Sequence, residues 1–222
     1  MSKKFNEIYQ ESLNNPENFW KEASENIFWF KKPSKILNKS NPPFYKWYED
    51  GVTNTCYNAL DFHIDQGKGS KTALIYDSPI TGNKNKFSYE ELRSKVSKFA
   101  GALKNQGVNK GDRVIIYMPM IPEAVIAMLA CARIGAIHSV VFGGFASNEL
   151  ASRIDDSKAK LLVTASCGFE PGRTVEYKPL VDEAIKLANH KISKMILFQR
   201  KGHEVKLNAP VEISWDEAHA NA

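Results

Sequence analysis

Short apolar segments alternate with helix-like segments from residue 72 onward, and no other feature of the sequence constrains the fold as strongly. The apolar segments are rich in Ile, Val and Leu, as strands buried on both faces should be. Right-handed crossovers between such strands require a mostly parallel sheet with helices on both faces. The predicted fold class is therefore α/β. The predicted strands span residues 72–76, 113–117, 137–142, 160–164 and 195–198.

Local sequence signals set the predicted helices between these strands. Ser88 and Glu91 form a capping box, and Gly107 ends the helix that they begin. We interpret the stretch 78–87 as a surface turn on the first strand, and the helix start at Trp215, close to the end of the chain, as a sign of truncation. The other predicted helices run over residues 122–133, 147–156 and 179–189.

The first 70 residues differ in character from the rest, so we predict an N-terminal arm (1–70) followed by an α/β subdomain (71–222). Large aromatic side chains and prolines are frequent in the arm, and short helices are expected at 4–14, 17–27 and 56–66. Pro16 suits the first turn of the second helix, where its missing N–H has no partner to lose. We expect the arm to wrap the larger body and to bury its aromatic side chains there.

Charge and composition exclude several classes of protein. The 222 residues carry a net charge of only +5, and the lysines among the aromatic residues of the arm are accompanied by acidic residues, so we predict no nucleic-acid partner. No clean apolar run approaches the roughly 20 residues of a membrane span, so no membrane association is predicted. Without an apolar leader or a transit-peptide composition at the N-terminus, a cytoplasmic location is expected.

Cysteine and histidine are arranged too sparsely to suggest a metal centre. Cys56, Cys131 and Cys167 form no CxxC pair, so reduced thiols are expected rather than zinc ligands. The five histidines are scattered, and His138, in an apolar strand, is expected to be a hydrogen-bonded core residue. Neither a nucleophile elbow nor an HExxH motif occurs, so no catalytic residue and no metal ligand is predicted.

Two segments follow predicted strands and could bind a ligand, because ligands of open α/β sheets bind beyond the carboxyl ends of the strands. Gly143 and Gly144 allow a ligand to approach the backbone, although any tight βα turn could use the same pair. In the second segment the chain turns at Pro171-Gly172 and presents Arg173, whose planar fork suits a phosphate. The residues alone thus indicate an α/β domain with a polyanion pocket and no defined reaction.

Longer stretches of the sequence resemble a known family. The runs YMPMIPEA (117–124) and MLACARIGAIHSVVFGGF (128–145) are similar to the AMP-forming acetyl- and propionyl-CoA synthetases, members of the acyl-adenylate-forming superfamily. Four shorter segments of the arm, YQES, PENFW, NPPF and CYNALD, also resemble the opening of that family. The resemblance covers essentially the whole chain and implies that it is the N-terminal third of a longer enzyme.

The resemblance implies a ligase that joins acetate or propionate to CoA with ATP, through an acyl-adenylate, releasing AMP and pyrophosphate. CoA and Mg-ATP are then substrates, with Mg²⁺ accompanying ATP and no cofactor held tightly by this chain. The family's phosphate loop, ribose-binding Asp and catalytic Lys have no counterpart here, so the chain alone is expected to be inactive. The implied CoA-binding residues are Phe142, Gly143, Gly144, Glu170, Pro171, Gly172 and Arg173.

One of these positions departs from the acetyl-type pattern. Acetyl-type members usually carry an arginine where this chain has Glu170. The segment EPGR (170–173) more closely resembles the propionate-preferring branch. The alternative function is a non-catalytic Rossmann-like nucleotide-binding or interaction module. A glycine-rich phosphate loop in the reading frame past Ala222 would favour the ligase, and a stop codon there would favour the module. The sequence leaves the oligomeric state open.

Overall fold

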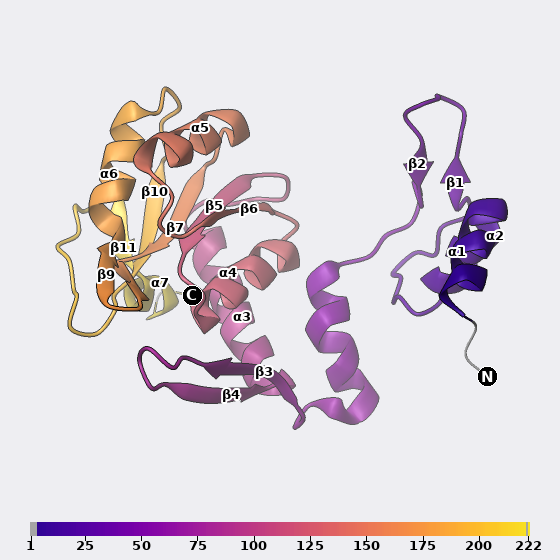
Figure 1. Cartoon of the computed structure of the whole chain (residues 1–222), viewed down its shortest axis with the longest axis horizontal. Coiled ribbons are helices and arrows are strands. Elements are labelled where there is room, and N and C mark those ends of the chain that lie inside the picture. The colour runs from indigo at the N-terminus through magenta and orange to yellow at the C-terminus, as the bar shows by residue number, and fades with distance from the viewer. Residues whose placement is uncertain (1–3, 221) are drawn as a thin grey trace. The chain divides into compact units, whose positions relative to one another are not determined.

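A computed structural model describes residues 4–220 and 222 of the chain. The chain divides into two compact units, Met1–Asn54 and Thr55–Ala222, which are described separately below (Figure 1). No helix within the described residues is long and apolar enough to cross a membrane.

The first unit contains two short helices and one small hairpin. Helix α1 (Phe5–Asn14) is followed by α2 (Pro16–Ser24), in which Pro16 occupies the predicted first-turn position. Strands β1 (Leu37–Asn38) and β2 (Lys46–Trp47) pair antiparallel. Within this unit the aromatic rings pack on one another. The ring centroids of Trp29 and Tyr48 lie 5.4 Å apart, and those of Trp20 and Trp47 lie 6.1 Å apart. That the arm wraps the body stays a prediction.

A parallel sheet of five strands forms the centre of the second unit, in the order β11-β10-β7-β5-β6. The chain adds β6 on one side of β5 and then returns to add β7 on the other side, so the strand order reverses between β5 and β7. The predicted parallel α/β sheet is confirmed. The strands are β5 (Arg113–Met118), β6 (Ile137–Phe142), β7 (Leu161–Ala165), β10 (Lys194–Phe198) and β11 (Glu212–Ser214).

Helices cover both faces of this sheet because the side chains of its central strands alternate between two apolar cores (Figure 1). Val114 and Ile116 enter one core, whereas Ile115 and Tyr117 enter the other. The first core is covered by α3 (Tyr89–Asn105), α4 (Pro122–Arg133) and α7 (Trp215–Ala220), and the second by α5 (Ser147–Ser157) and α6 (Tyr177–Leu187). The capping box predicted at Ser88 and Glu91 is present at the start of α3.

Two helical turns precede the α/β region. The π-helical turns η1 (Tyr57–Asp61) and η2 (Ile64–Lys68) correspond to the helix predicted at 56–66. Leu60 of η1 enters the first core, and Asp61 pairs with Arg133 at 2.6 Å, which joins η1 to the end of α4.

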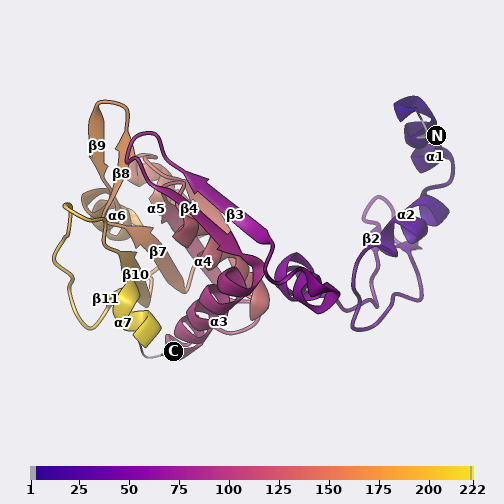
Figure 2. The same cartoon turned by 90° about the horizontal axis from the view of Figure 1, so that it is seen from below.

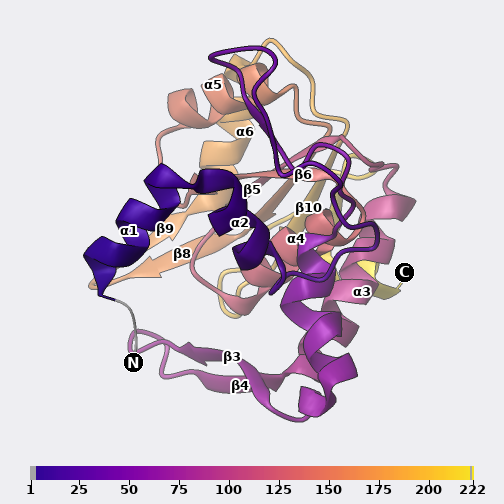
Figure 3. The ribbon, with the colours of Figure 1, turned by 90° about the vertical axis from the view of Figure 1, so that its right-hand side faces the viewer.

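The first predicted strand does not join the main sheet, and this expectation is wrong. Strand β3 (Thr72–Asp77) pairs antiparallel with β4 (Lys84–Ser88), so the stretch 78–87 is a second strand and its turn rather than a surface turn alone. Figure 3 shows this hairpin apart from the five-stranded sheet. The alternation of strand and helix does not report which strand pairs with which, and a short β3–β4 connection favours a local hairpin.

Strand β6 is an edge strand, which corrects the expectation for His138. That residue is exposed rather than part of the core, as are Ile137 and Phe142 on the same strand. An apolar segment looks alike in a central strand and in an edge strand. All three cysteines are buried and reduced, as predicted, and burial raises the pKa of the Cys131 thiol to about 12.

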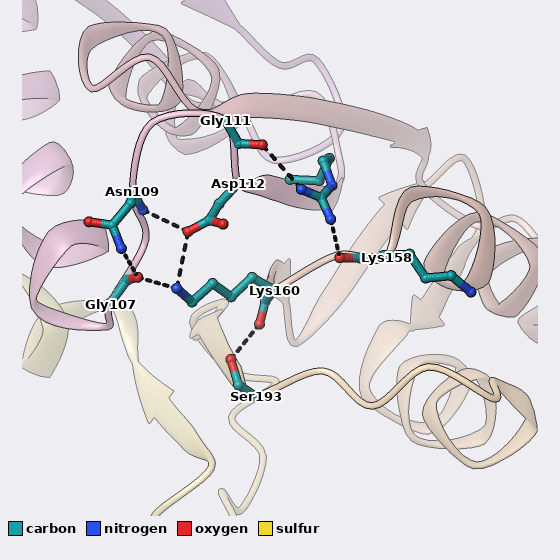
Figure 4. Close-up of polar contacts among 8 residues, drawn as sticks. Gly107, Asn109, Gly111, Asp112, Lys158, Lys160 and Ser193 are labelled. Carbon is teal, nitrogen blue, oxygen red and sulfur yellow. Dashed lines mark hydrogen bonds and ion pairs between the residues drawn. The ribbon is translucent and has the colours of Figure 1, made fainter.

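Hydrogen bonds and ion pairs close the amino edge of the sheet (Figure 4). Lys160 binds both the carboxylate of Asp112, at 3.1 Å, and the carbonyl of Gly107. Arg113 donates to the carbonyls of Ser157 and Lys158, which end α5. Side chains at the starts of β5 and β7 therefore bind the carbonyl groups and the carboxylate that this edge exposes.

Candidate functional site

A cavity of about 350 Å³ opens at the opposite, carboxyl edge of the sheet. It is lined by the loop that follows β5 (Met118 to Ile121), by the end of β6, and by the hairpin that follows β7. The reversal of strand order between β5 and β7 lies at this point, and such reversals are the usual ligand site of open α/β sheets because the flanking loops diverge there. The tip of the β3–β4 hairpin, from Asp77 to Thr81, forms its outer wall.

The loop after β6 is arched and is held from below by a tyrosine. Gly144 has a φ of 95°, a conformation that glycine adopts without strain. Its N–H donates to Oη of Tyr117 at 3.1 Å, and Oη of Tyr117 donates to the carbonyl of Phe145 at 2.8 Å. The rings of Phe142 and Phe145 lie 5.6 Å apart at the two ends of the arch. The glycine pair therefore has a structural requirement in this loop.

A second tyrosine lies between this loop and the segment after β7. A Cβ on Gly168 would lie 2.5 Å from Oη of Tyr177, and a Cβ on Gly143 would collide with the same hydroxyl. Only glycine at both positions leaves room for this side chain. Burial, followed by the neighbouring Tyr117 and Glu170, raises the pKa of Tyr177 to about 12. Burial also raises the pKa of Tyr117, so both hydroxyls keep their protons at neutral pH.

The segment after β7 is a hairpin, which confirms the turn predicted at Pro171-Gly172. Strands β8 (Cys167–Glu170) and β9 (Arg173–Glu176) pair antiparallel, with Glu170 opposite Arg173. Gly172 has a φ of 77°, as a tight turn requires. Arg173 binds Oε2 of Glu170 through Nε at 2.7 Å and through Nη2 at 2.6 Å. The exposed guanidinium is therefore partly neutralised by the neighbouring carboxylate.

The two predicted segments approach each other. A Cβ on Gly144 would lie 3.7 Å from Oε1 of Glu170. Phe142, Gly143 and Glu170 line the cavity, whereas the remaining predicted residues do not. Gly144 belongs to the arch beside it, and the Pro171-Gly172 turn with Arg173 forms an exposed rim farther along the hairpin. CoA binding by these residues stays a prediction.

Three side chains of this region are not among the residues predicted from the sequence. Tyr117 and Tyr177 support the glycine loop from within the second core. Arg200 follows β10, is 8% exposed and lines the cavity. Arg200 lies just beyond the predicted strand 195–198, so its position after a strand end, like that of Gly143, is the sequence signal that marks it. Within the described residues, no cluster of three metal-ligating side chains occurs.

Comparison with known proteins identifies the class of the chain. Residues 62–220 match the family model "AMP-binding enzyme", and residues 5–59 match the model "Acetyl-coenzyme A synthetase N-terminus". The chain therefore belongs to the AMP-binding enzyme family. Within that family it is similar to short-chain acyl-CoA and acetyl-CoA synthetases, as the sequence analysis predicted.

Three relatives show how far this similarity extends. The human "Acyl-CoA synthetase short-chain family member 3, mitochondrial" is 53% identical over 212 residues, which cover 95% of this chain and 31% of the relative. "Acetyl-coenzyme A synthetase" from Streptomyces avermitilis is 43% identical over 96% of this chain and 32% of its own length. The solved structure of "Acetoacetyl-CoA Synthetase from Streptomyces lividans" covers 99% of this chain and 33% of its own, with a TM-score of 0.85 at 23% identity. The last comparison supports the fold.

The chain spans about a third of the length of these relatives. The activity and the substrates of a whole enzyme are therefore matters for a proposal.

Proposed function

We propose that this chain is part of an AMP-forming short-chain acyl-CoA ligase and contributes to the surface that binds CoA. The enzyme would convert acetate or propionate, ATP and CoA into acyl-CoA, AMP and pyrophosphate. ATP, with its Mg²⁺, and CoA act as substrates. The similarity of both parts of the chain to family models for such enzymes is the observation that carries this proposal.

The reaction consists of two displacements. A carboxylate oxygen attacks the α-phosphorus of ATP, the bond from that phosphorus to the bridging oxygen breaks, and pyrophosphate leaves with the electron pair. The sulfur of CoA, having lost its proton, then attacks the acyl carbon, and AMP leaves as the carbon–oxygen bond breaks. We assign no catalytic residue of either step to this chain.

The role of this chain would be to hold the anionic nucleotide end of CoA. The arched loop at Gly143-Gly144 allows the nucleotide to approach the backbone, and the exposed ring of Phe142 offers a surface for a base. Arg173 supplies a planar pair of donors for a phosphate. Glu170 competes for the same guanidinium, so a phosphate must displace or share the carboxylate. We therefore expect weaker phosphate binding than at a site with two arginines.

The activity is tested by carboxylate-dependent exchange of pyrophosphate into ATP. A protein consisting of these 222 residues should show no exchange, because the phosphate loop, the ribose-binding Asp and the catalytic Lys of such enzymes have no counterpart in it. A full-length enzyme with this chain as its first third should exchange label with acetate or propionate. Turnover by the printed chain alone would overturn the assignment of roles, and an inactive full-length enzyme would favour the non-catalytic module.

The CoA surface is tested by calorimetry with CoA on the same protein. Arg173→Ala should weaken CoA binding about tenfold, the loss of one charge-assisted contact. Arg153→Ala, the same change at an exposed arginine on α5, serves as the control and should leave the affinity unchanged. Equal affinities for the wild type and Arg173→Ala would remove Arg173 from the site.

Three further assignments are proposals of the same kind. We propose a cytoplasmic location, although the name of the human relative contains the word mitochondrial. We propose no nucleic-acid partner and no membrane partner. The segment EPGR (170–173) resembles the propionate-preferring branch of the family more than the acetyl-type branch, which favours propionate as the acid.

A further inference from the structure

Arg200 is a buried cation at the carboxyl edge of the sheet that the proposed function does not use. It follows β10 by two residues, and its backbone is fixed because its N–H donates to Oγ of Ser166 at 2.9 Å and its carbonyl accepts from the N–H of His203. Its guanidinium carbon lies 4.6 Å from the centre of the Phe169 ring. The side chain is thus held in one place rather than free in solvent.

Within the described residues, the guanidinium of Arg200 makes no hydrogen bond and no ion pair, although the residue is only 8% exposed. Glu123 lines the same cavity and is near enough for the charge of Arg200 to act on its carboxyl group. No nitrogen of Arg200 is among the fully buried side-chain atoms that lack a partner within the described residues, so its donors remain accessible from the cavity. The cation–π contact with Phe169 uses none of the five N–H donors, which leaves them available to a ligand.

Arg200 also lines a second cavity, of about 520 Å³, whose lining does not include the glycine loop. This volume lies in the range typical of small-molecule sites. Gln199 also lines it, but the Gln199 amide is taken by both the N–H and the carbonyl of Val205. Apart from Glu123 of α4, the other polar side chains at this cavity belong to the β3–β4 hairpin and to the residue after Arg200: Tyr76, Thr81, Asn83, Asn85 and Lys201.

We propose that this cavity binds a phosphoryl group, with the Arg200 guanidinium as its principal ligand. The fork of Arg200 would donate two parallel hydrogen bonds to two phosphate oxygens. Hydroxyl and amide groups from the hairpin, such as those of Thr81 and Asn85, would donate to the remaining oxygens. The site goes beyond the proposed function, because it lies apart from Arg173 and the turn at Pro171-Gly172.

The lining favours a phosphate over a carboxylate. A carboxylate offers two oxygens in one plane, whereas a tetrahedral phosphate offers three or four and can be approached from both walls of the cavity at once. Lys201 adds a second positive charge, which favours a dianion. Glu123 is the acidic residue among those that line the cavity. Burial raises the pKa of Glu123, and the positive charge of Arg200 opposes part of that rise; an anion bound to Arg200 would cancel this opposition and raise the pKa further.

The hairpin that closes this cavity connects it to the candidate site. Figures 1 and 2 both place the tip of β3–β4 beside the β8–β9 hairpin, and Tyr76, Thr81, Phe169 and Arg200 line both cavities. A phosphoryl group on Arg200 would thus fix the wall that the two cavities share. We expect phosphate binding to order the β3–β4 turn.

The test is to titrate the 222-residue protein with inorganic phosphate and, separately, with pyrophosphate and with acetate. Calorimetry and ³¹P NMR detect the binding. Wild type should bind phosphate or pyrophosphate saturably and should bind acetate at least about tenfold more weakly. Arg200→Met keeps the packing on Phe169 and removes the donors, and it should weaken phosphate binding at least about tenfold. Arg153→Met removes an exposed arginine by the same substitution and should change nothing.

Further variants keep the test decisive if Arg200→Met does not fold. Arg200→Lys keeps the charge but loses the fork and should weaken phosphate binding several-fold, and Asn85→Ala on the exposed hairpin should do the same. Arg173→Ala should leave phosphate binding intact even where it impairs CoA binding. Failure of wild type to bind phosphate, equal binding by Arg200→Met, or loss of phosphate binding in Arg173→Ala would each overturn the proposal.

Discussion

The amino and carboxyl edges of the central sheet differ in how their charged side chains are paired. At the amino edge, Lys160 pairs with Asp112, and Arg113 donates to nearby backbone carbonyls (Figure 4). At the carboxyl edge, two cavities open, and Arg200 has a ring beside it but makes no ion pair within the described residues. Both edges carry arginine and lysine, so composition does not distinguish them. The difference lies in whether the charged groups find their partners within the fold.

This difference indicates which edge is available for ligands. Polar groups that satisfy one another contribute to stability and have no donors to offer. Small residues and unpaired donors at the carboxyl edge contribute less to stability and leave space and hydrogen-bonding capacity. We therefore expect substitutions at the amino edge to change the free energy of unfolding without changing ligand binding, and substitutions at the carboxyl edge to change both.

The largest effect on stability is expected at Gly143. An alanine there would bring its Cβ against the hydroxyl of Tyr177 and within 2.9 Å of the Met118 carbonyl oxygen, so Gly143→Ala should lower the free energy of unfolding by about 3 kcal/mol. Urea denaturation measures this. Gly111→Ala at the amino edge meets no atom within 4 Å and should cost about 1 kcal/mol, from its φ of 84° alone.

A second substitution tests the cause of that loss. Tyr177→Phe removes the hydroxyl that the new methyl group would meet, so adding it to Gly143→Ala should recover part of the stability. If Gly143→Ala costs no more than Gly111→Ala, the loop is not packed against Tyr177 as described.

The sequence predicted the elements of this fold more reliably than their pairing. The strand 137–142 and the helix 122–133 have the predicted bounds, because apolar periodicity is local, as are Pro122 in the first turn of the helix and Gly135, with a φ of 73°, just beyond its end. His138 was placed in the core and is exposed, since an edge strand carries no local mark. For the same reason the strand predicted at 72–76 is expected in the main sheet, whereas β3 pairs with β4.

The candidate site was predictable to the extent that it depends on strand ends. Gly143 directly follows β6, Glu170 lies in the hairpin that follows β7, and the structure brings them to one cavity. Tyr177 lies at the start of a helix and reaches the site only because Gly143 and Gly168 leave room for it. That three-dimensional requirement leaves no pattern that a periodicity or a motif detects.

Tyr117→Phe should give the next largest effect and should change binding as well as stability. Without its hydroxyl, the Gly144 N–H and the Phe145 carbonyl both lose a partner in a half-buried place, which should cost about 1–2 kcal/mol by urea denaturation. CoA affinity should fall in the same variant because the arch is no longer held. Tyr57→Phe, which removes an exposed hydroxyl bonded to Asp65, should change neither quantity. Unchanged CoA affinity in Tyr117→Phe would separate the arch from the proposed CoA surface.

Asp112→Asn should show the behaviour expected of the amino edge. The Asn109 N–H, followed by Lys160, holds the pKa of Asp112 below its usual value, so its charged form stabilises the fold. This contribution, about 1 kcal/mol, is present above the pKa of the unfolded chain, near 4, and is lost as the pH falls through the lower folded value. The stability gap between wild type and Asp112→Asn should therefore be largest at pH 7 and close in acid, with CoA and phosphate affinities unchanged. A gap that does not depend on pH would exclude the carboxylate charge as its cause.

Glu170→Gln should have the smallest effect on stability. Unlike Tyr117→Phe, it should strengthen CoA binding rather than weaken it. The Glu170–Arg173 pair is exposed, so its loss should change the free energy of unfolding by less than about 0.5 kcal/mol. Freeing Arg173 should tighten CoA binding about threefold at low salt, an advantage that shrinks as salt screens the exposed charges. The same substitution at Glu49, in the exposed pair with Lys46, should leave CoA binding unchanged. If Glu170→Gln instead weakens CoA binding, the carboxylate is itself a ligand, which would give a reason for this chain to carry glutamate at that position.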